Sequence, residues 1–321
     1  SGLGSGLTVT SEARIITTGD SDRIQLSSER DLTVQPVANG TAALQAGNDL
    51  RLLVGDTDQL RLSSGQYDAA GSFILGSLDD LTINSVFDAA DIGVDRIGFS
   101  AGGTLTVTQE GGVRAAESID LSAKELIFAG TLEVTDTTST ATTRLHATER
   151  LEVGGNINLP VELRLESDQD IVIANADIAV TGADREFNIV AGESLDLGNV
   201  EPVANQANPP GAVTLEGTDH LNIEVGGTLR LGGNADVYTT AADAAITIDV
   251  ENAEIAGRIF AGASLNPAAL GNPIWSEAIG TGTASLTLNA NDEITLGGDQ
   301  LIETGEQAGE VIASPAVLLA S

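Results

Sequence analysis

The chain has 321 residues, of which 41% are hydrophobic, so it can bury a sizeable core and is not a disordered tail. Its formal net charge of −33, from 47 acidic and 14 basic residues, disfavours nucleic acid and anionic membrane surfaces as partners, because both need clustered basic side chains. The chain has no cysteine, which excludes disulfides and thiolate metal sites.

One motif recurs many times along the chain. It consists of an apolar-x-apolar strand, a short polar turn and a second apolar-x-apolar strand. Aromatic residues make up only 3% of the chain, so aliphatic side chains must fill the interior. In chain order the copies lie at 24–34, 44–52, 73–83, 97–107, 119–128, 144–153, 163–173, 187–197, 213–223 and 286–296.

The last apolar residue before each turn defines the period of the repeat. Through the middle of the chain these anchors are about 22 residues apart, which is the length of one solenoid coil. We expect all of them in the core: Leu26, Leu44, Leu75, Phe99, Leu121, Leu145, Leu165, Ile189, Leu215 and Leu288.

Strict alternation within each short strand gives one apolar face and one wet face. Such strands bury little alone, but stacking equivalent strands about 4.8 Å apart makes a continuous parallel sheet around an aliphatic column. The sequence therefore predicts an all-β, right-handed parallel β-helix of about 22 residues per coil, continuous over residues 1–321. Proline-containing stretches near 200–212 and 264–284 are predicted to be projecting loops.

Glycine-rich segments are expected at the corners of the coil. They occur at 154–156, 226–227 and 232–234, and we expect them to supply the bends with positive φ that a coil needs.

A family resemblance lies in the pattern L-x-A-x-x-x-L-x-V, present here as LQAGNDLRL, FSAGGTLTV and LSAKELIF. The chain resembles the filamentous-haemagglutinin-like exoproteins exported by two-partner secretion and, more loosely, the passenger domains of autotransporters. The resemblance covers most of the chain, although many right-handed β-helices share the pattern. The NPNL and NPNGI motifs of the family's secretion domain are missing, so the resemblance implies a shaft segment and not the export module.

Catalysis has few candidate residues in this sequence. A catalytic triad needs a histidine, and the two that exist, His146 and His220, lie in the turn motifs HATER and TDHLN, without a G-x-S-x-G nucleophile elbow. Both are better interpreted as polar turn residues, and we assign no catalytic, cofactor-binding or metal-binding residue. The prediction is that the chain is not an enzyme. The alternative is a carbohydrate-active β-helix enzyme, a polysaccharide lyase or glycoside hydrolase, which a clustered Asp/Arg groove on one sheet would support.

Acidic residues recur at the turn that precedes the second strand of the motif. If they align on one corner, they form a column of like charges, which is interpreted as a solvated edge in preference to a weak Ca²⁺ ladder because no calcium loop is complete. No cofactor is expected. The residues concerned are Asp31, Asp49, Asp80, Glu125, Asp170, Glu193, Asp219 and Glu293.

Trp275, the single tryptophan, lies in the second predicted loop. Two interpretations stay open for it, an anchor for a ligand or partner and a cover for one end of the apolar column.

These observations predict a structural and adhesive function. We expect a stalk segment of a large secreted or cell-surface bacterial protein that presents binding loops or forms an extracellular filament. The expected partner is a host-cell, neighbouring-cell or matrix receptor, protein or glycan, with end-to-end self-association and without membrane insertion. The first ten residues, SGLGSGLTVT, have no basic or apolar signal region, so an export signal is expected outside this chain.

Overall fold

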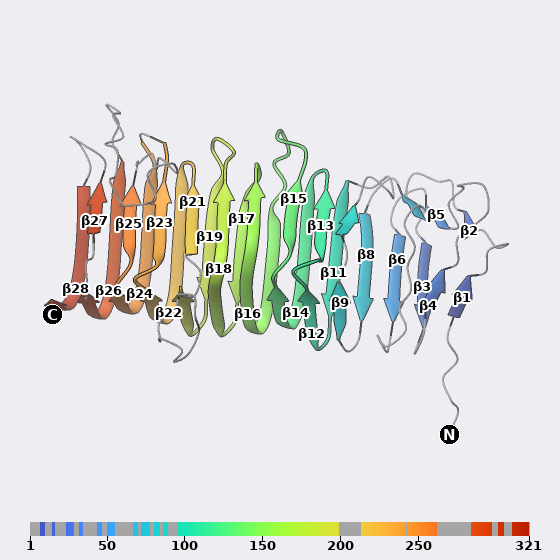
Figure 1. Ribbon diagram of the computed structural model, residues 1–321, viewed down its shortest axis with the longest axis horizontal. Helices are drawn as coiled ribbons and strands as arrows, with labels where there is room; N and C mark the ends of the chain where they lie inside the picture. The colour runs from blue at the N-terminus through green and yellow to red at the C-terminus, as the bar shows by residue number, and fades with distance from the viewer. Residues whose placement is uncertain are drawn as a thin grey trace, which may run out of the picture. The chain divides into compact units, whose positions relative to one another are not determined.

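The computed structural model describes residues 95–198, 213–241, 243–261 and 284–296 continuously, with Asp80 and separate strands before residue 89 and after residue 300. These residues form an all-β, parallel β-solenoid of about seven turns, and no helix occurs among them. The strands stack side by side in parallel (Figure 1). Paired strands lie about 24 residues apart in the chain, which confirms the predicted solenoid with a slightly longer period. In the part of the chain described, no helix is long and apolar enough to cross a membrane.

The chain divides into two compact units, Ser1–Thr148 and Glu149–Ser321. The predicted loop at 200–212 lies outside the described residues, as does the predicted loop at 264–284 apart from the buried Ala284. The strands of the first unit are β1 (Leu7–Val9), β2 (Ile15–Ile16), β3 (Ile24–Ser28), β4 (Leu32–Val34), β5 (Leu44–Ala46), β6 (Leu50–Val54), β7 (Tyr67–Ala69), β8 (Ser72–Ser77), β9 (Leu81–Ile83), β10 (Val86–Asp88), β11 (Arg96–Ala101), β12 (Thr104–Val107), β13 (Gly112–Ala115), β14 (Ser118–Phe128) and β15 (Thr131–Val134).

Strand β16 (Thr143–Leu159) begins in the first unit and ends in the second. The remaining strands of the second unit are β17 (Leu163–Ser167), β18 (Asp170–Val180), β19 (Glu186–Ala191), β20 (Ser194–Leu197), β21 (Val213–Gly217), β22 (His220–Leu231), β23 (Ala235–Thr239), β24 (Ala245–Ile255), β25 (Arg258–Ala261), β26 (Ser285–Leu296), β27 (Leu301–Thr304) and β28 (Glu310–Ala320).

Each turn of the second unit contributes to three parallel ladders. The first ladder runs through β17, β19 and the amino-terminal halves of β22, β24, β26 and β28. The second ladder comprises the middle of β16, the start of β18, β20 and the carboxy-terminal halves of β22, β24, β26 and β28. The third ladder comprises the ends of β16 and β18 followed by β21, β23, β25 and β27. Long strands such as β22 therefore bend around a corner, where the register shifts between Val225 and Thr228.

The first unit repeats the same three ladders. Its first ladder runs through β3, β6, β8, β11 and the start of β14, its second through β9, β12 and the end of β14, and its third through β10, β13 and β15. Two smaller sheets, β1 with β4 and β2 with β5 and β7, are also parallel. Three strands per turn is one more than the two-strand motif predicts.

Inward-pointing aliphatic side chains of all three ladders fill the core. Of the predicted anchors with a described side chain, only Leu26 is half-buried, and the others are at most 2% exposed: Leu75, Phe99, Leu121, Leu145, Leu165, Ile189, Leu215 and Leu288. The side chain of the remaining anchor, Leu44, lies outside the described residues. Two anchors do not lie in the first ladder with the others. Leu44 pairs with Ile15 in a small separate sheet, and Leu215 pairs with Ile178 in the third ladder.

Glycine has two separate uses at the corners. Gly155 has φ 78°, as the sequence predicts, and Asn175 on the next turn has φ 54°, which asparagine tolerates. The pairs 226–227 and 232–233 do not have positive φ, so that part of the prediction is wrong. Gly226 instead permits close approach, since a Cβ there would lie 2.2 Å from the backbone oxygen of Gly192.

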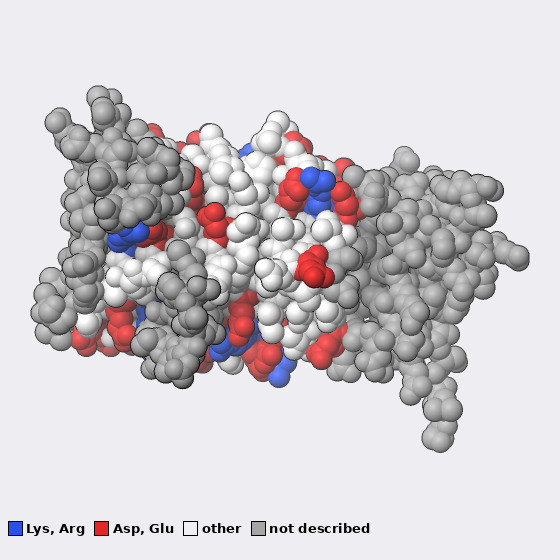
Figure 2. All heavy atoms as spheres, viewed as in Figure 1, with Lys and Arg blue, Asp and Glu red and all other residues white. Residues whose placement is uncertain are grey.

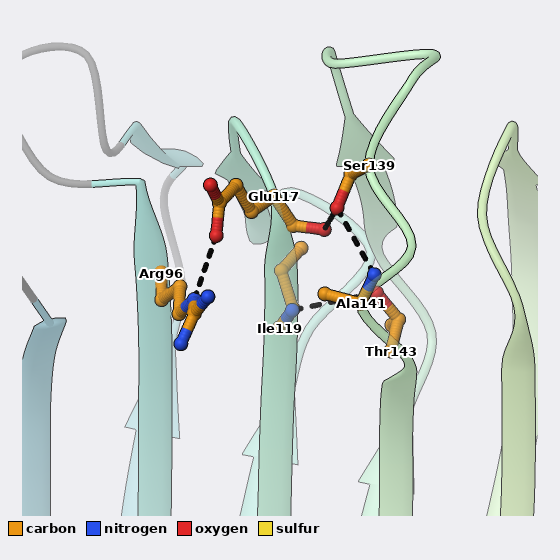
Figure 3. A network of polar contacts seen from close by, with 6 residues as sticks. All are labelled: Arg96, Glu117, Ile119, Ser139, Ala141 and Thr143. Atoms are coloured by element: carbon orange, nitrogen blue, oxygen red, sulfur yellow. Dashed lines mark hydrogen bonds and ion pairs between the residues drawn. The ribbon is translucent and has the colours of Figure 1, made fainter.

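Buried hydroxyl groups hold the connection between β15 and β16 in the first unit (Figure 3). The Ser139 hydroxyl donates to the Glu117 backbone oxygen at 3.3 Å and accepts from the Ala141 backbone N–H at 3.1 Å. The Thr143 hydroxyl, which has no exposed surface, accepts from the Ile119 N–H at 3.4 Å. These bonds satisfy backbone groups at the start of β14 and in the β15–β16 connection.

Candidate functional site

The residues that sequence reasoning considered for catalysis lie in different units. His146 is half-buried on β16 and lines a surface hollow of about 440 Å³ in the first unit, together with Lys124 and Ser122. His220 is exposed at the start of β22 in the second unit, where it stands in register with Glu186. Trp275 lies outside the described residues. Within the described ranges, no group of three or more His, Asp or Glu side chains has an arrangement that could hold a metal ion.

The described acidic residues of the turn motif do not align in one column, so the condition for a ladder of like charges is not met. At the start of the second ladder of the second unit, the residues in register are Arg150, Asp170, Ser194, Thr228, Asn252 and Glu293. In the first unit, Thr104 stands between Asp80 and Glu125. Asp219 lies at another corner, next to the start of the first ladder. Like charges are therefore not neighbours on successive turns of this column.

Hydroxyl and amide groups cap the acids of that column from the next turn. The Thr104 backbone N–H donates to Asp80 Oδ1 at 2.7 Å, and the Ser194 hydroxyl donates to Asp170 Oδ1 at 2.5 Å. Each bond satisfies a carboxylate oxygen from the adjacent turn of the solenoid.

Three arginine side chains on the outer face, Arg114, Arg230 and Arg258, are paired with acids on adjacent turns. Arg114 donates to Asp88 Oδ2 at 3.3 Å on one side and to Glu133 Oε1 at 2.8 Å on the other. The hydrogen bonds to Glu133 and then to Asp88 raise the pKa of Arg114. On the face shown in Figure 2, most of the basic atoms likewise lie beside acidic ones.

The same arrangement recurs twice in the second unit. Arg230 lies between Asp196 and Glu254, with Nη1 3.2 Å from Asp196 Oδ1 and Nε 3.5 Å from Glu254 Oε2. Arg258 makes a bidentate pair with Asp236, in which both nitrogen-to-oxygen distances are 2.6 Å. Each pair joins two turns of the solenoid, because the partners are in register on adjacent strands.

Tyr238 is the one tyrosine whose surroundings are described, and it is 5% exposed. Its hydroxyl donates to Glu216 Oε2 at 2.7 Å, again between strands in register. Burial, and secondarily the bond to Glu216, raise the pKa of Tyr238 well above its ordinary value.

Arg230 also borders the principal hollow that we consider for ligand binding. This hollow, the Arg230 groove, has a volume of about 600 Å³ and is lined by Thr228, Arg230, Asn252, Glu254, Glu293 and Thr295 among others. Sequence reasoning missed it because its residues are contributed by β22, β24 and β26, and their register depends on insertions of different length. The sequence does contain an arginine at 230 and an acid at 254. That they are neighbours on adjacent turns is known only once the strands are paired.

A second hollow of about 500 Å³ in the same unit is bordered by Glu224, Asp249 and Asn289, which are in register on the first ladder. The Asn289 amide donates to Asp249 Oδ1 at 2.7 Å.

Comparison with protein-family models, curated proteins and solved structures gave no match. The β-solenoid fold and these surface features are therefore the observations that bear on function.

Proposed function

We propose that the chain is a shaft segment of a large secreted or cell-surface bacterial adhesin, similar to the filamentous-haemagglutinin-like exoproteins. The observation that carries the proposal is the persistence of register across insertions. Asn188 and Asn222 are 34 residues apart and Asp249 and Asn289 are 40 apart, yet both pairs are in-register neighbours on the first ladder. A solenoid with this property can carry loops of different length without interrupting its core.

Bonding between adjacent turns supports a mechanical role. Backbone ladders and buried apolar side chains join adjacent turns, and arginine–carboxylate pairs join some of them, so stability accumulates along the chain as in other repeat proteins. The strongly acidic surface favours solubility and opposes nonspecific self-association. Adhesion through a host-cell, neighbouring-cell or matrix receptor belongs to the same proposal.

The proposal can be tested by displaying the chain on a non-adherent bacterium, between a membrane anchor and an epitope tag. We expect these cells to attach to cultured epithelial cells or to matrix-coated plates more than cells that display the tag alone. A Leu165→Asp variant, which places a charge in the core, is expected to lose attachment. Equal attachment by the tag-only cells would contradict the adhesive function.

Localisation needs a separate measurement. Antibodies against the chain should label intact cells of the natural producer, and brief protease treatment of those cells should remove the signal. Labelling that appears only after lysis would contradict a surface location.

A second candidate, a carbohydrate-active enzyme, is favoured by the acid-and-arginine groove on one ladder. Its test is turnover of neutral and uronic polysaccharides, followed by reducing ends and by absorbance of unsaturated uronates. Turnover that disappears in Arg230→Gln would favour the enzyme over the adhesive shaft.

A further inference from the structure

Arg230 is held in place by its neighbours and still has donors to offer. Its contacts with Asp196 and Glu254 use Nη1 and Nε, and its side chain is 35% exposed. A guanidinium has five N–H donors, so those of Nη2 are available to a ligand. Because carboxylates on both adjacent turns orient the planar group, little side-chain entropy is lost when a ligand binds.

The surface beside Arg230 is recessed because the residues at this corner have small side chains or none. Gly232, Gly233 and Ala256 line the Arg230 groove, and a Cβ built on Gly233 would meet only the Ala256 backbone oxygen, at 3.5 Å. The volume of about 600 Å³ is in the range typical of small-molecule sites.

We propose that the Arg230 groove binds a neutral polyhydroxylated chain, an oligosaccharide, laid across β22, β24 and β26. Sugar hydroxyls both donate and accept hydrogen bonds, and the groove offers donors at Arg230 and Asn252 and acceptors at Glu254 and Glu293. Thr228 can do either, whereas the Thr295 hydroxyl donates to Glu293 Oε1 at 3.0 Å and therefore offers a ligand only an acceptor. This inference rests on the proposed adhesive function and assigns the glycan class of receptor to a particular surface.

The charged residues of the groove disfavour anionic and cationic ligands. The acids at Asp196, Glu254 and Glu293 outnumber the single arginine, so a polyanionic chain is repelled. A cationic ligand would have to lie against the guanidinium. An uncharged chain avoids both costs.

The affinity of a single groove is expected to be weak. None of the residues that line it is aromatic, so the stacking that strengthens most sugar sites is missing from this surface. We expect a dissociation constant of about 1 mM for a hexasaccharide, which corresponds to about 4 kcal/mol. Display of many copies on a cell surface would raise the effective affinity.

The test measures binding of the full chain to cellohexaose, chitohexaose and mannohexaose by saturation-transfer NMR and calorimetry, with hexagalacturonate as the anionic comparison. We expect at least one neutral hexasaccharide to bind. Arg230→Gln and Gly233→Gln, the second of which fills the groove, should each weaken that binding at least tenfold. Arg114→Gln is the matched control, because Arg114 is also held between two acids but borders none of the described hollows considered above.

Circular dichroism of each variant establishes that the fold is retained. Absence of binding by all three neutral hexasaccharides at 20 mM, which is about twenty times the expected dissociation constant, would overturn the proposal. So would tighter binding of hexagalacturonate or an equal loss in Arg114→Gln. If Arg230→Gln keeps full cell attachment in the display assay, the groove assignment fails while the adhesive shaft stands.

Discussion

The inward and outward sides of the same strands follow different rules. In β20, Leu195 and Leu197 have no exposed surface and face other aliphatic residues on every turn, whereas Asp196 between them faces Arg230. Inward positions are apolar on most turns, because a polar group in a narrow core must be hydrogen-bonded, as the Thr143 hydroxyl is. Outward positions vary among acids, bases, amides and hydroxyl groups, and several of their partners lie on neighbouring turns. The interior therefore specifies the fold, and the exterior is free to acquire binding surfaces.

The sharpest contrast is predicted between neighbouring residues of β20. Leu195→Ala should lower the free energy of unfolding by about 2–5 kcal/mol, through lost burial and the cavity that remains. Asp196→Ala should cost about 1 kcal/mol or less, because its ion pair with Arg230 is partly exposed. Urea unfolding followed by circular dichroism measures both free energies, and similar losses in the two variants would contradict the difference between inward and outward positions.

Two glycines test how closely the turns approach each other. A Cβ at Gly192 would lie 1.9 Å from the Asp168 backbone oxygen, so Gly192→Ala should destabilise by about 1–3 kcal/mol. At the outward-facing Gly98, a Cβ would meet Ile74 Cγ1 at 3.7 Å and Asp120 O at 3.8 Å, which are ordinary contacts. Gly98→Ala should therefore stabilise by about 0.5–1 kcal/mol, since glycine is costly within a strand. A midpoint temperature of thermal unfolding that shifts in the same direction in both variants would contradict this packing.

Arginine pairs should differ according to their exposure. Arg258→Gln removes a bidentate pair whose side chains are 24% and 13% exposed, and we expect a loss of about 1–2 kcal/mol. Arg150→Gln removes the pair with Glu152 on the same strand, where the exposures are 48% and 41%, and should cost about 0.5 kcal/mol or less. Added salt should reduce the loss of unfolding free energy caused by Arg150→Gln more than the loss caused by Arg258→Gln. A greater loss at Arg150 than at Arg258 in urea unfolding would show that the cross-turn pair is not the stronger one.

The smallest expected effect is confined to alkaline pH. The pKa of Tyr238 is raised in the folded state, so the folded chain retains a proton that the unfolded chain releases. Its contribution to stability is complete below the unfolded pKa of about 10 and is lost as the pH rises above it. Tyr238→Phe should make stability less dependent on pH in this range, as measured by urea unfolding between pH 9 and 11. An unchanged pH dependence would show that Tyr238 is not the group responsible.

Alternation and the spacing of anchors were enough to predict the parallel solenoid and the buried positions of Leu121, Leu165 and Ile189. The third ladder was not predicted, because strands such as Gly112–Ala115 have few large apolar side chains and resemble turns. The repeat was also misaligned at 213–223. The motif there combines β21, a strand of the third ladder, with the start of β22, which belongs to the first ladder of the next turn.

Surface features were harder to predict than the core. Asp170 and Glu293 seemed to belong to a stack of acids, but Ser194, Thr228 and Asn252 stand between them in register. The Arg230 groove depends on the same pairing. Neither follows from sequence alone, since each unpredicted shift in register changes which outward residues are neighbours.

Cross-linking between adjacent turns tests the parallel stacking most directly, and the chain has no cysteine of its own to interfere. Asn188 and Asn222 are in register, with the Asn222 amide 2.9 Å from Asn188 Oδ1. The double variant Asn188→Cys/Asn222→Cys should form an intramolecular disulfide under mild oxidation, because adjacent parallel strands place the two Cα atoms within bonding range. Asn188→Cys/Glu224→Cys, two residues out of register, should stay reduced. Equal disulfide formation in both variants, or none in the first, would contradict the parallel stacking on which the fold, the shaft and the groove all depend.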